Sequence, residues 1–477
     1  TQYTDLTGTG NLLGRYYGLR DEGGSGSTFD YDATFKRTFT PRKHELSVEA
    51  RFNRDRDQDA TTAWRHDAVA SPTTQPATPA VAPALTLGEI DASVAVTKQL
   101  TLQTDYTRPL GNTKLETGVK SNTRWLDRDY AVQTDSLGNG SWAPSALSNA
   151  IRFDETVTAA YGLLSGKHGR AELQGGVRGE LATRDFSLTG SGVRVPYRYA
   201  SLFPSANALY NLSGADQLKL SYSRRIRRPG TQELNPFPVF FGAQNVFLGN
   251  PALDPEYTDA VELGYSRTGA LGMLQINPFL RHTINAIRFV VNPTDTVAGR
   301  ELTSITFRNV AAMNTWGTDL LGSVHMGSRL SGFIGANVFR MVTDAGSQTS
   351  AAASGTTWSA RANMTAEVLP TVTLQGSYFY RAPMNFAGGR FLSMQMTTLT
   401  LKKKVDGDNA AITVRVSDPF STGRFGAYGL NGSVQQLTER SFGMRAAYVG
   451  FQYNYGRPPK IRQPDQGSQQ QNAPGFP

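Results

Sequence analysis

The sequence predicts an all-β fold, an antiparallel transmembrane β-barrel, from three observations. Apolar and polar residues alternate along many segments, short and long connections alternate between those segments, and glycine and aromatic residues are frequent. Glycine is 48 of 477 residues and the aromatics are 10%, yet mean hydropathy is −0.37. A barrel in lipid has this composition, because alternate residues face hydrocarbon while the others face a wet lumen.

Alternation with a period of two identifies the strands. It is clearest in LTLQTDYT (100–107), LKLSYS (218–223), VTLQGSYFY (372–380) and ITVRVS (412–417). Successive side chains of a strand point to opposite faces, so each segment predicts a strand with one apolar and one polar face. Sustained helical periodicity is absent, and no run of about eighteen apolar residues predicts a helical membrane span.

The connections between the strands alternate in length. Short polar turns are predicted at LGNT (110–113), SGKHGR (165–170), SGADQ (213–217), RTGALG (267–272), MGSR (326–329) and DGDN (406–409). Longer connections are predicted at 54–88, 136–147, 229–256, 293–301, 344–354 and 384–390. Transmembrane barrels have short periplasmic turns and long extracellular loops, so we expect roughly eighteen membrane-crossing strands. A soluble sandwich or propeller is the alternative, but its strands are usually shorter.

The end of the chain divides in two. VGFQYNYG (449–456) alternates apolar and polar residues, as expected for a final strand that reaches an aromatic girdle at the membrane interface. The residues that follow are rich in proline and glutamine and are expected to be a disordered periplasmic tail. The predicted domains are therefore a barrel over 1–456 and a tail over 457–477.

Composition excludes several functions. The chain has no cysteine, so no disulfide or thiolate metal site can form, and its five histidines contain no HExxH pair. The net charge of +9 is spread over the whole length rather than collected in a nucleic-acid-binding arm. GTGNLLG (8–14) lacks the spacing of a nucleotide-binding GxGxxG turn. We therefore expect no enzyme activity, no cofactor and no nucleic-acid partner.

One acidic motif is a weak candidate for a calcium site. Asp55, Asp57 and Asp59 have the spacing of the first three ligands of a calcium loop, inside a predicted long outer loop. Ala60 stands where such a loop needs glycine, and His66 stands where it needs a bidentate glutamate. A solvated charged loop is the alternative, and no other metal site is predicted.

An arginine cluster ends the strand that contains Leu218. Arg224 and Arg228 fall on the face of Leu218 in the alternating pattern, above the hydrocarbon, where they could pair with lipid or lipopolysaccharide head groups. Arg225 and Arg227 fall on the opposite face, where they could attract an anionic ligand. The alternative is a structural role, with acidic partners on neighbouring strands.

The long loop from Pro229 to Glu256 is rich in phenylalanine. Large apolar side chains are unfavourable in water, so we expect this loop to pack on neighbouring loops or on a ligand. Phe237, Phe240 and Phe241 are the predicted ligand-contacting aromatics. With the two arginines that face away from Leu218, they make up the predicted ligand site.

Two stretches of this region resemble the barrel of TonB-dependent outer-membrane receptors, in the outer membrane β-barrel subgroup. They are SYSRRIRRP (221–229) with LNPF (234–237), and GNPALDPEYTDAVELGY (249–265). Further similar segments are DYTRPLGNTKLETGVK (105–120), FRNVAAMNTWGTDL (307–320) and VSDPF (416–420).

The resemblance implies a receptor of the bacterial outer membrane that takes up a scarce nutrient, such as a ferric siderophore, a glycan or a peptide. Such receptors have about twenty-two strands, an N-terminal plug and a TonB box, and neither plug nor box is visible in this sequence. We therefore expect the C-terminal part of a receptor, with the plug and first strands before Thr1 and with TonB as partner. A passive porin-like channel and a structural or adhesive surface barrel that binds a protein partner are the alternatives.

Overall fold

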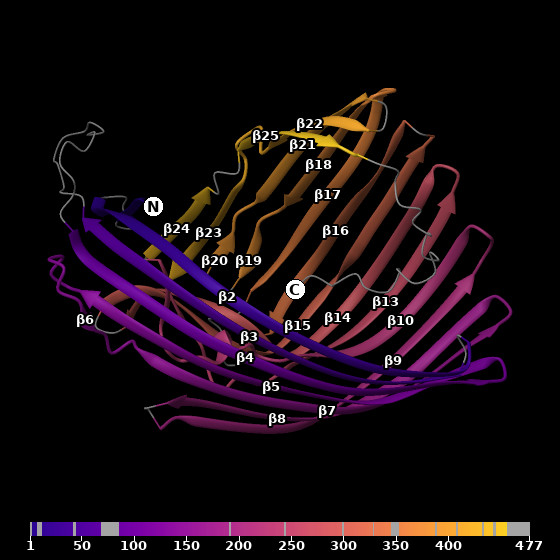
Figure 1. Ribbon diagram of the computed structural model, residues 1–477, viewed down its shortest axis with the longest axis horizontal. Coiled ribbons are helices and arrows are strands. Elements are labelled where there is room, and N and C mark those ends of the chain that lie inside the picture. Colours follow the sequence, from indigo (N-terminus) through magenta and orange to yellow (C-terminus); the bar gives the residue numbers. More distant parts are fainter. Residues whose placement is uncertain are drawn as a thin grey trace.

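The wall of the protein is a single antiparallel meander (Figure 1). The computed structural model describes residues 2–6, 12–41, 44–67, 85–189, 192–242, 245–297, 300–327, 329–344, 353–386, 389–406, 409–431, 434–441 and 445–455. Over these residues one sheet has 21 strands and a second has four. Three of the 21 are short, β6 (Ala143–Pro144), β11 (Val239–Gly242) and β12 (Asn245–Leu248), and the other eighteen form the wall. The all-β, antiparallel prediction is confirmed, with the expected number of wall strands.

Each wall strand pairs with the next one along the chain. The wall strands are β1 (Gln2–Leu6), β2 (Leu12–Thr40), β3 (His44–Asp67), β4 (Leu85–Leu110), β5 (Thr113–Asp135), β7 (Asn149–His168), β8 (Ala171–Thr189), β9 (Arg194–Asn211), β10 (Asp216–Arg227), β13 (Glu256–Gly269), β14 (Gly272–Val297), β15 (Arg300–Met326), β16 (Leu330–Asp344), β17 (Ser354–Leu369), β18 (Val372–Arg381), β21 (Met394–Asp406), β22 (Ala410–Ser417) and β25 (Ala446–Tyr453). In the described part of the chain the edge strands β1 and β25 are not paired with each other, so the wall is a strongly curved open sheet.

The two faces of the wall differ as the alternation predicts, and β8 shows the difference most clearly. Its outward residues Leu173 and Leu181 are 57% and 56% exposed, as lipid-facing side chains must be. Its inward residues Glu180, Arg184 and Phe186 are buried. The hydrophobic surface therefore lies outside and the charged surface inside, the reverse of a soluble domain.

The connections alternate in length as predicted, and the short turns gather along one rim, at the right of Figure 1. Two predicted long connections are wrong in extent. The segment 54–88 is strand as far as Asp67, because β3 continues well beyond the membrane, paired with both β2 and β4. The segment 293–301 is largely the end of the β14–β15 hairpin, which pairs up to Val297 with Arg300.

The remaining elements lie in the long connections. The connection from β10 to β13 contains helix α1 (Thr231–Leu234) and the β11–β12 hairpin, and β12 pairs in parallel with β15. The second sheet consists of β19 (Met384–Phe386), β20 (Gly389–Phe391), β23 (Arg424–Asn431) and β24 (Val434–Ser441).

The predicted final strand is confirmed. It is β25, paired with β22, and Val449, Phe451 and Tyr453 are exposed on it. The predicted tail over 457–477 lies outside the described residues. Among the described residues, no helix has the length and apolar character to cross a membrane.

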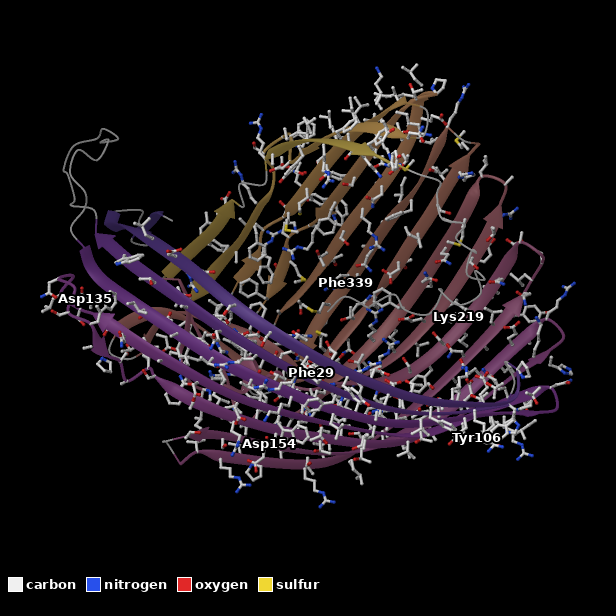
Figure 2. The ribbon with its side chains drawn as sticks, viewed as in Figure 1. Phe29, Tyr106, Asp135, Asp154, Lys219 and Phe339 are labelled. Carbon is white, nitrogen blue, oxygen red and sulfur yellow. The ribbon has the colours of Figure 1, made fainter. Side chains whose placement is uncertain are left out.

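We expect the rim of long connections to be extracellular and the rim of short turns to be periplasmic. Asp135 marks the former rim and Tyr106 and Lys219 lie toward the latter (Figure 2). Leu137, 76% exposed beside Asp135, and Leu271, 67% exposed in the β13–β14 turn, offer a matched pair of sites in a chain without cysteine. An impermeant maleimide should label Leu137→Cys in intact cells, but label Leu271→Cys only after the outer membrane is opened. The opposite labelling pattern would contradict this orientation.

Candidate functional site

The connection over residues 228–255 is called the internal segment here, and its described parts, 228–242 and 245–255, fold into the barrel rather than outward. It enters where two wall strands separate. Beyond Ser223, β10 no longer pairs with β9 and pairs only with β13, while β9 continues along β8 as far as Arg194. Because the wall is open at this point, the chain can turn from the end of β10 into the lumen.

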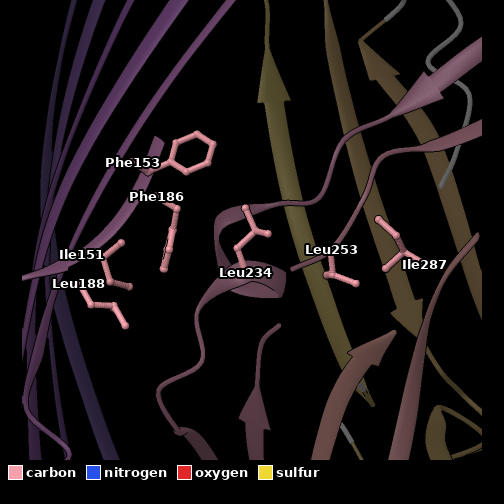
Figure 3. Packing of buried hydrophobic residues seen from close by; sticks show 7 residues of the cluster. All are labelled: Ile151, Phe153, Phe186, Leu188, Leu234, Leu253 and Ile287. Carbon is pink, nitrogen blue, oxygen red and sulfur yellow. The ribbon is translucent and has the colours of Figure 1, made fainter. Parts of the chain in front are cut away.

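A hydrophobic cluster holds both ends of the internal segment in place. Leu234 and Leu253, both fully buried, lie between two parts of the wall (Figure 3). The wall side chains around them are Ile151 and Phe153 of β7, Phe186 and Leu188 of β8, and Ile287 of β14. Burying a leucine of this kind contributes roughly 1.5–3 kcal/mol. The two leucines therefore give the segment a strong preference for the interior.

The middle of the segment reaches both β15 and β5. Residues 245–248 of β12 pair in parallel with 303–306 of β15. The fully buried Val246 packs against Val132 of β5 and against Leu147. The internal segment thus contacts β5, β7 and β8 on one side and β14 and β15 on the other, and it crosses the outer part of the lumen.

Side-chain hydrogen bonds fix the return of the segment to the wall. Asn309 of β15 accepts a bond from the backbone N–H of Asp254 at 2.9 Å and donates to its carbonyl at 3.0 Å. Arg184 donates to the carbonyl of Leu253 at 3.2 Å, and Tyr197 donates to the Asp254 carboxylate at 2.8 Å. A buried backbone without strand partners needs such substitutes, since an unpaired polar group there is costly.

Gly249 allows the two ends of the internal segment to touch. Its N–H donates to the carbonyl of Asn235 at 2.7 Å, and the next N–H, of Asn250, donates to the carbonyl of Glu233 at 2.6 Å. A Cβ at Gly249 would lie 2.5 Å from the backbone nitrogen and oxygen of Asn235. The start of the GNPALDPE stretch therefore has a structural role, because it joins the later part of the internal segment to α1 and Asn235.

The arginine cluster has the acidic partners that the structural alternative predicted. Arg224 pairs with Asp259 at 3.7 Å, and Arg227 pairs with Glu233 of α1 and with Glu256. Arg225 is exposed and makes no hydrogen bond or ion pair with the described residues.

Arg228 is not the lipid-facing residue that alternation predicted. It lies past the end of β10, where the period of two no longer applies, and its guanidinium bonds the buried Glu180 carboxylate and, at 2.7 Å, the Tyr199 hydroxyl. Burial works to lower the pKa of Arg228, but Tyr199 and Glu180 outweigh it, so that pKa lies above its ordinary value. Arg228 therefore stays charged and ties the start of the internal segment to β8.

Of the three predicted ligand-contacting aromatics, the structure describes the side chain of Phe237. Phe237 is partly buried against the hydrophobic cluster, and its N–H donates to the Asn235 side chain at 3.1 Å. The side chains of Phe240 and Phe241 lie outside the described part of the structure. Contact of these residues, or of Arg225 and Arg227, with a ligand stays a prediction.

The acidic motif does not form the expected calcium loop. Asp55, Asp57 and Asp59 occupy alternate positions of β3, so their side chains project from one face of an extended strand. A calcium loop would instead curve around the ion. The carboxylates of Asp57 and Asp59 lie over Gly26 and Gly24 of β2. No group of three or more acidic, histidine or cysteine side chains in the described ranges is arranged to hold a metal ion.

A charged cleft on the inner wall, called the inner-wall cleft here, was not found from the sequence. It has a volume of about 280 Å³ and lies on β4, β5, β7 and β8. Its charged residues are Lys120, Arg124, Arg178, Arg228, Glu155 and Glu180. The signal for it, charged residues on the inward faces of adjacent strands, becomes visible only when the register of those strands is known.

The internal segment can be released by a single change at Gly249. Gly249→Val places a branched side chain against the Asn235 backbone, so we expect the segment to lose its closure. Amide hydrogen exchange over 231–253 should become at least about tenfold faster, with the barrel still assembled. Ala252→Val, at an exposed position of the same segment, is the control and should leave exchange unchanged. Equal exchange in both variants would show that the closure is not needed.

Comparisons with known proteins agree with this architecture. A model of the outer membrane protein beta-barrel family matches residues 37–455. A search of curated protein sequences finds no match. Among solved structures, the chain is similar to the ferric yersiniabactin uptake receptor FyuA from Yersinia pestis, at 13% identity and TM-score 0.53, over 94% of this chain and 73% of that one.

Two other structures are similar over most of the chain. The copper transporter OprC matches at 13% identity and TM-score 0.57, over 95% of this chain and 74% of that one. The ferric-catecholate import receptor Fiu from E. coli K12 matches at 13% identity and TM-score 0.61, over 90% and 64%. At these identities the likeness concerns the fold. With the family match over most of its length, the chain belongs to the outer membrane protein β-barrel family and is a protein of the bacterial outer membrane.

Proposed function

We propose that the chain is the barrel of a TonB-dependent receptor that imports a scarce nutrient across the outer membrane. The observation that supports this most is the internal segment, which crosses the outer part of a wide, polar lumen. A wall of this size encloses more space than side chains can fill, and transporters with large barrels close that space with internal elements. The solved structures of similar fold are named as uptake receptors and a transporter, which supports the same function.

A passive porin is less consistent with this interior. A porin needs an open aqueous channel, whereas here buried leucines and paired backbone groups occupy the outer lumen. A structural or adhesive barrel would place its recognition surface on outward loops. The connection over 228–255, one of the two longest between described wall strands, instead turns inward.

The energised step of this proposal needs two partners. A plug within the lumen would respond to TonB, and we propose that this barrel works together with such a plug. The barrel over 1–456 would then supply the wall and the outer recognition surface, with outer-membrane lipid around it. Arg225, Arg227, Phe237, Phe240 and Phe241 remain the proposed ligand contacts at the mouth.

Transport can be tested in cells of the source bacterium that lack the gene. Labelled ferric citrate, a ferric catecholate, cobalamin, an oligosaccharide and a peptide would be offered separately. We expect saturable accumulation of one of them only when the gene is restored, and loss of that accumulation when the proton-motive force is collapsed. Accumulation that continues without the proton-motive force, and rises linearly with concentration, would instead indicate a passive channel.

A further inference from the structure

The inner-wall cleft lies directly below the hydrophobic cluster, along the same strands. On β5 the cleft residues Lys120 and Arg124 precede the cluster residue Leu126, counted from the short-turn rim. On β8 the cleft residue Glu180 precedes the cluster residue Phe186 in the same direction. A solute that passes the internal segment from outside therefore meets the cleft next.

The cleft has more positive than negative charge. Four cations line it, against the two carboxylates of Glu155 and Glu180. Glu180 is already engaged by both Arg178, at 2.6 Å, and Arg228. The negative charge of Glu180 is therefore balanced by these two arginines.

The other two cations have weaker partners. Arg124 is 3.8 Å from Glu155, beyond hydrogen-bond distance, and its buried Nε has no hydrogen-bond partner in the described structure. Its guanidinium lies over the ring of Phe153, 4.8 Å from the centroid, which holds it in position. Lys120 makes no hydrogen bond or ion pair with the described residues.

Cations held in a concave, partly desolvated surface attract anions more strongly than exposed cations do. Lys120 and Arg124 lie on the same face of β5, and an ammonium and the outer N–H groups of a guanidinium can each donate a charge-assisted hydrogen bond to an oxygen of a carboxylate or a phosphate. We propose that the inner-wall cleft binds an anionic group, a carboxylate or phosphate, of a small solute that crosses the barrel. This inference rests on the proposed function, because it assigns a class of ligand, anionic, to the transported nutrient.

The test uses the full chain purified in detergent and two probes, citrate and inorganic phosphate, with binding measured by calorimetry. Wild type should bind at least one of them at millimolar concentration or below. Lys120→Gln and Arg124→Gln should each weaken binding about tenfold, the loss expected for one charge-assisted hydrogen bond. Lys219→Gln removes an inner-wall lysine outside the cleft, toward the short-turn rim in Figure 2, and should leave binding unchanged. The cation spermidine should not compete.

Three results would overturn the inference. These are no binding of either anion by wild type, binding that survives the Lys120→Gln/Arg124→Gln double substitution, and binding that disappears when a plug is present in the same barrel. The third result would show that the cleft is a contact for the plug. Energy-dependent uptake without anion binding would support the proposed function and contradict only the anion site in the cleft. Anion binding with energy-independent uptake would support the anion site and contradict the proposed function.

Discussion

Hydrocarbon offers no hydrogen-bond partner to a polypeptide, and the rest of this structure follows from that constraint. Every backbone N–H and C=O in the membrane must be paired within the wall, which requires long antiparallel strands in register. Leu102, Leu220 and Leu374 then face lipid, and alternate residues must face inward. A wall of eighteen strands consequently encloses a wide interior lined by polar side chains, and the molecule needs a second set of interactions to organise that interior.

The internal segment supplies those interactions. Leu234 and Leu253 bring an apolar core into a lumen that is otherwise polar, and Asn309 replaces the strand pairing that the segment lacks. Arg228 and Glu180 join the start of the segment to β8 in the inner-wall cleft, which both residues line. The same ion pair therefore holds the internal segment in place and sets part of the charge of the inner-wall cleft. The position of the segment and the electrostatics of the cleft are linked through it.

The sequence was most informative where lipid imposes a pattern. Segments such as 100–107 and VGFQYNYG alternate because one face meets hydrocarbon; the first lies within β4 and the second is strand as far as Tyr453. Beyond the membrane neither face of a strand meets hydrocarbon, so the alternation is no longer required. Around Asp57 both faces of β3 are polar, so a strand was taken for a loop. Arg228 was assigned to the wrong side because β10 ends one residue earlier. The cleft depends on the register of four strands, which is a long-range property that no single segment contains.

The account depends most on the internal segment lying inside the barrel, across the lumen. The direct measurement is disulfide formation in a chain that has no cysteine of its own. Val132→Cys and Val246→Cys place two thiols in one buried cluster, on β5 and on the internal segment. Mild oxidation of the assembled protein in outer membranes should join them rapidly, whereas a pair at Leu137 and Val246 should stay reduced. If the first pair stays reduced and Val246→Cys reacts with an impermeant maleimide from outside, the segment is an outward loop and the account is wrong.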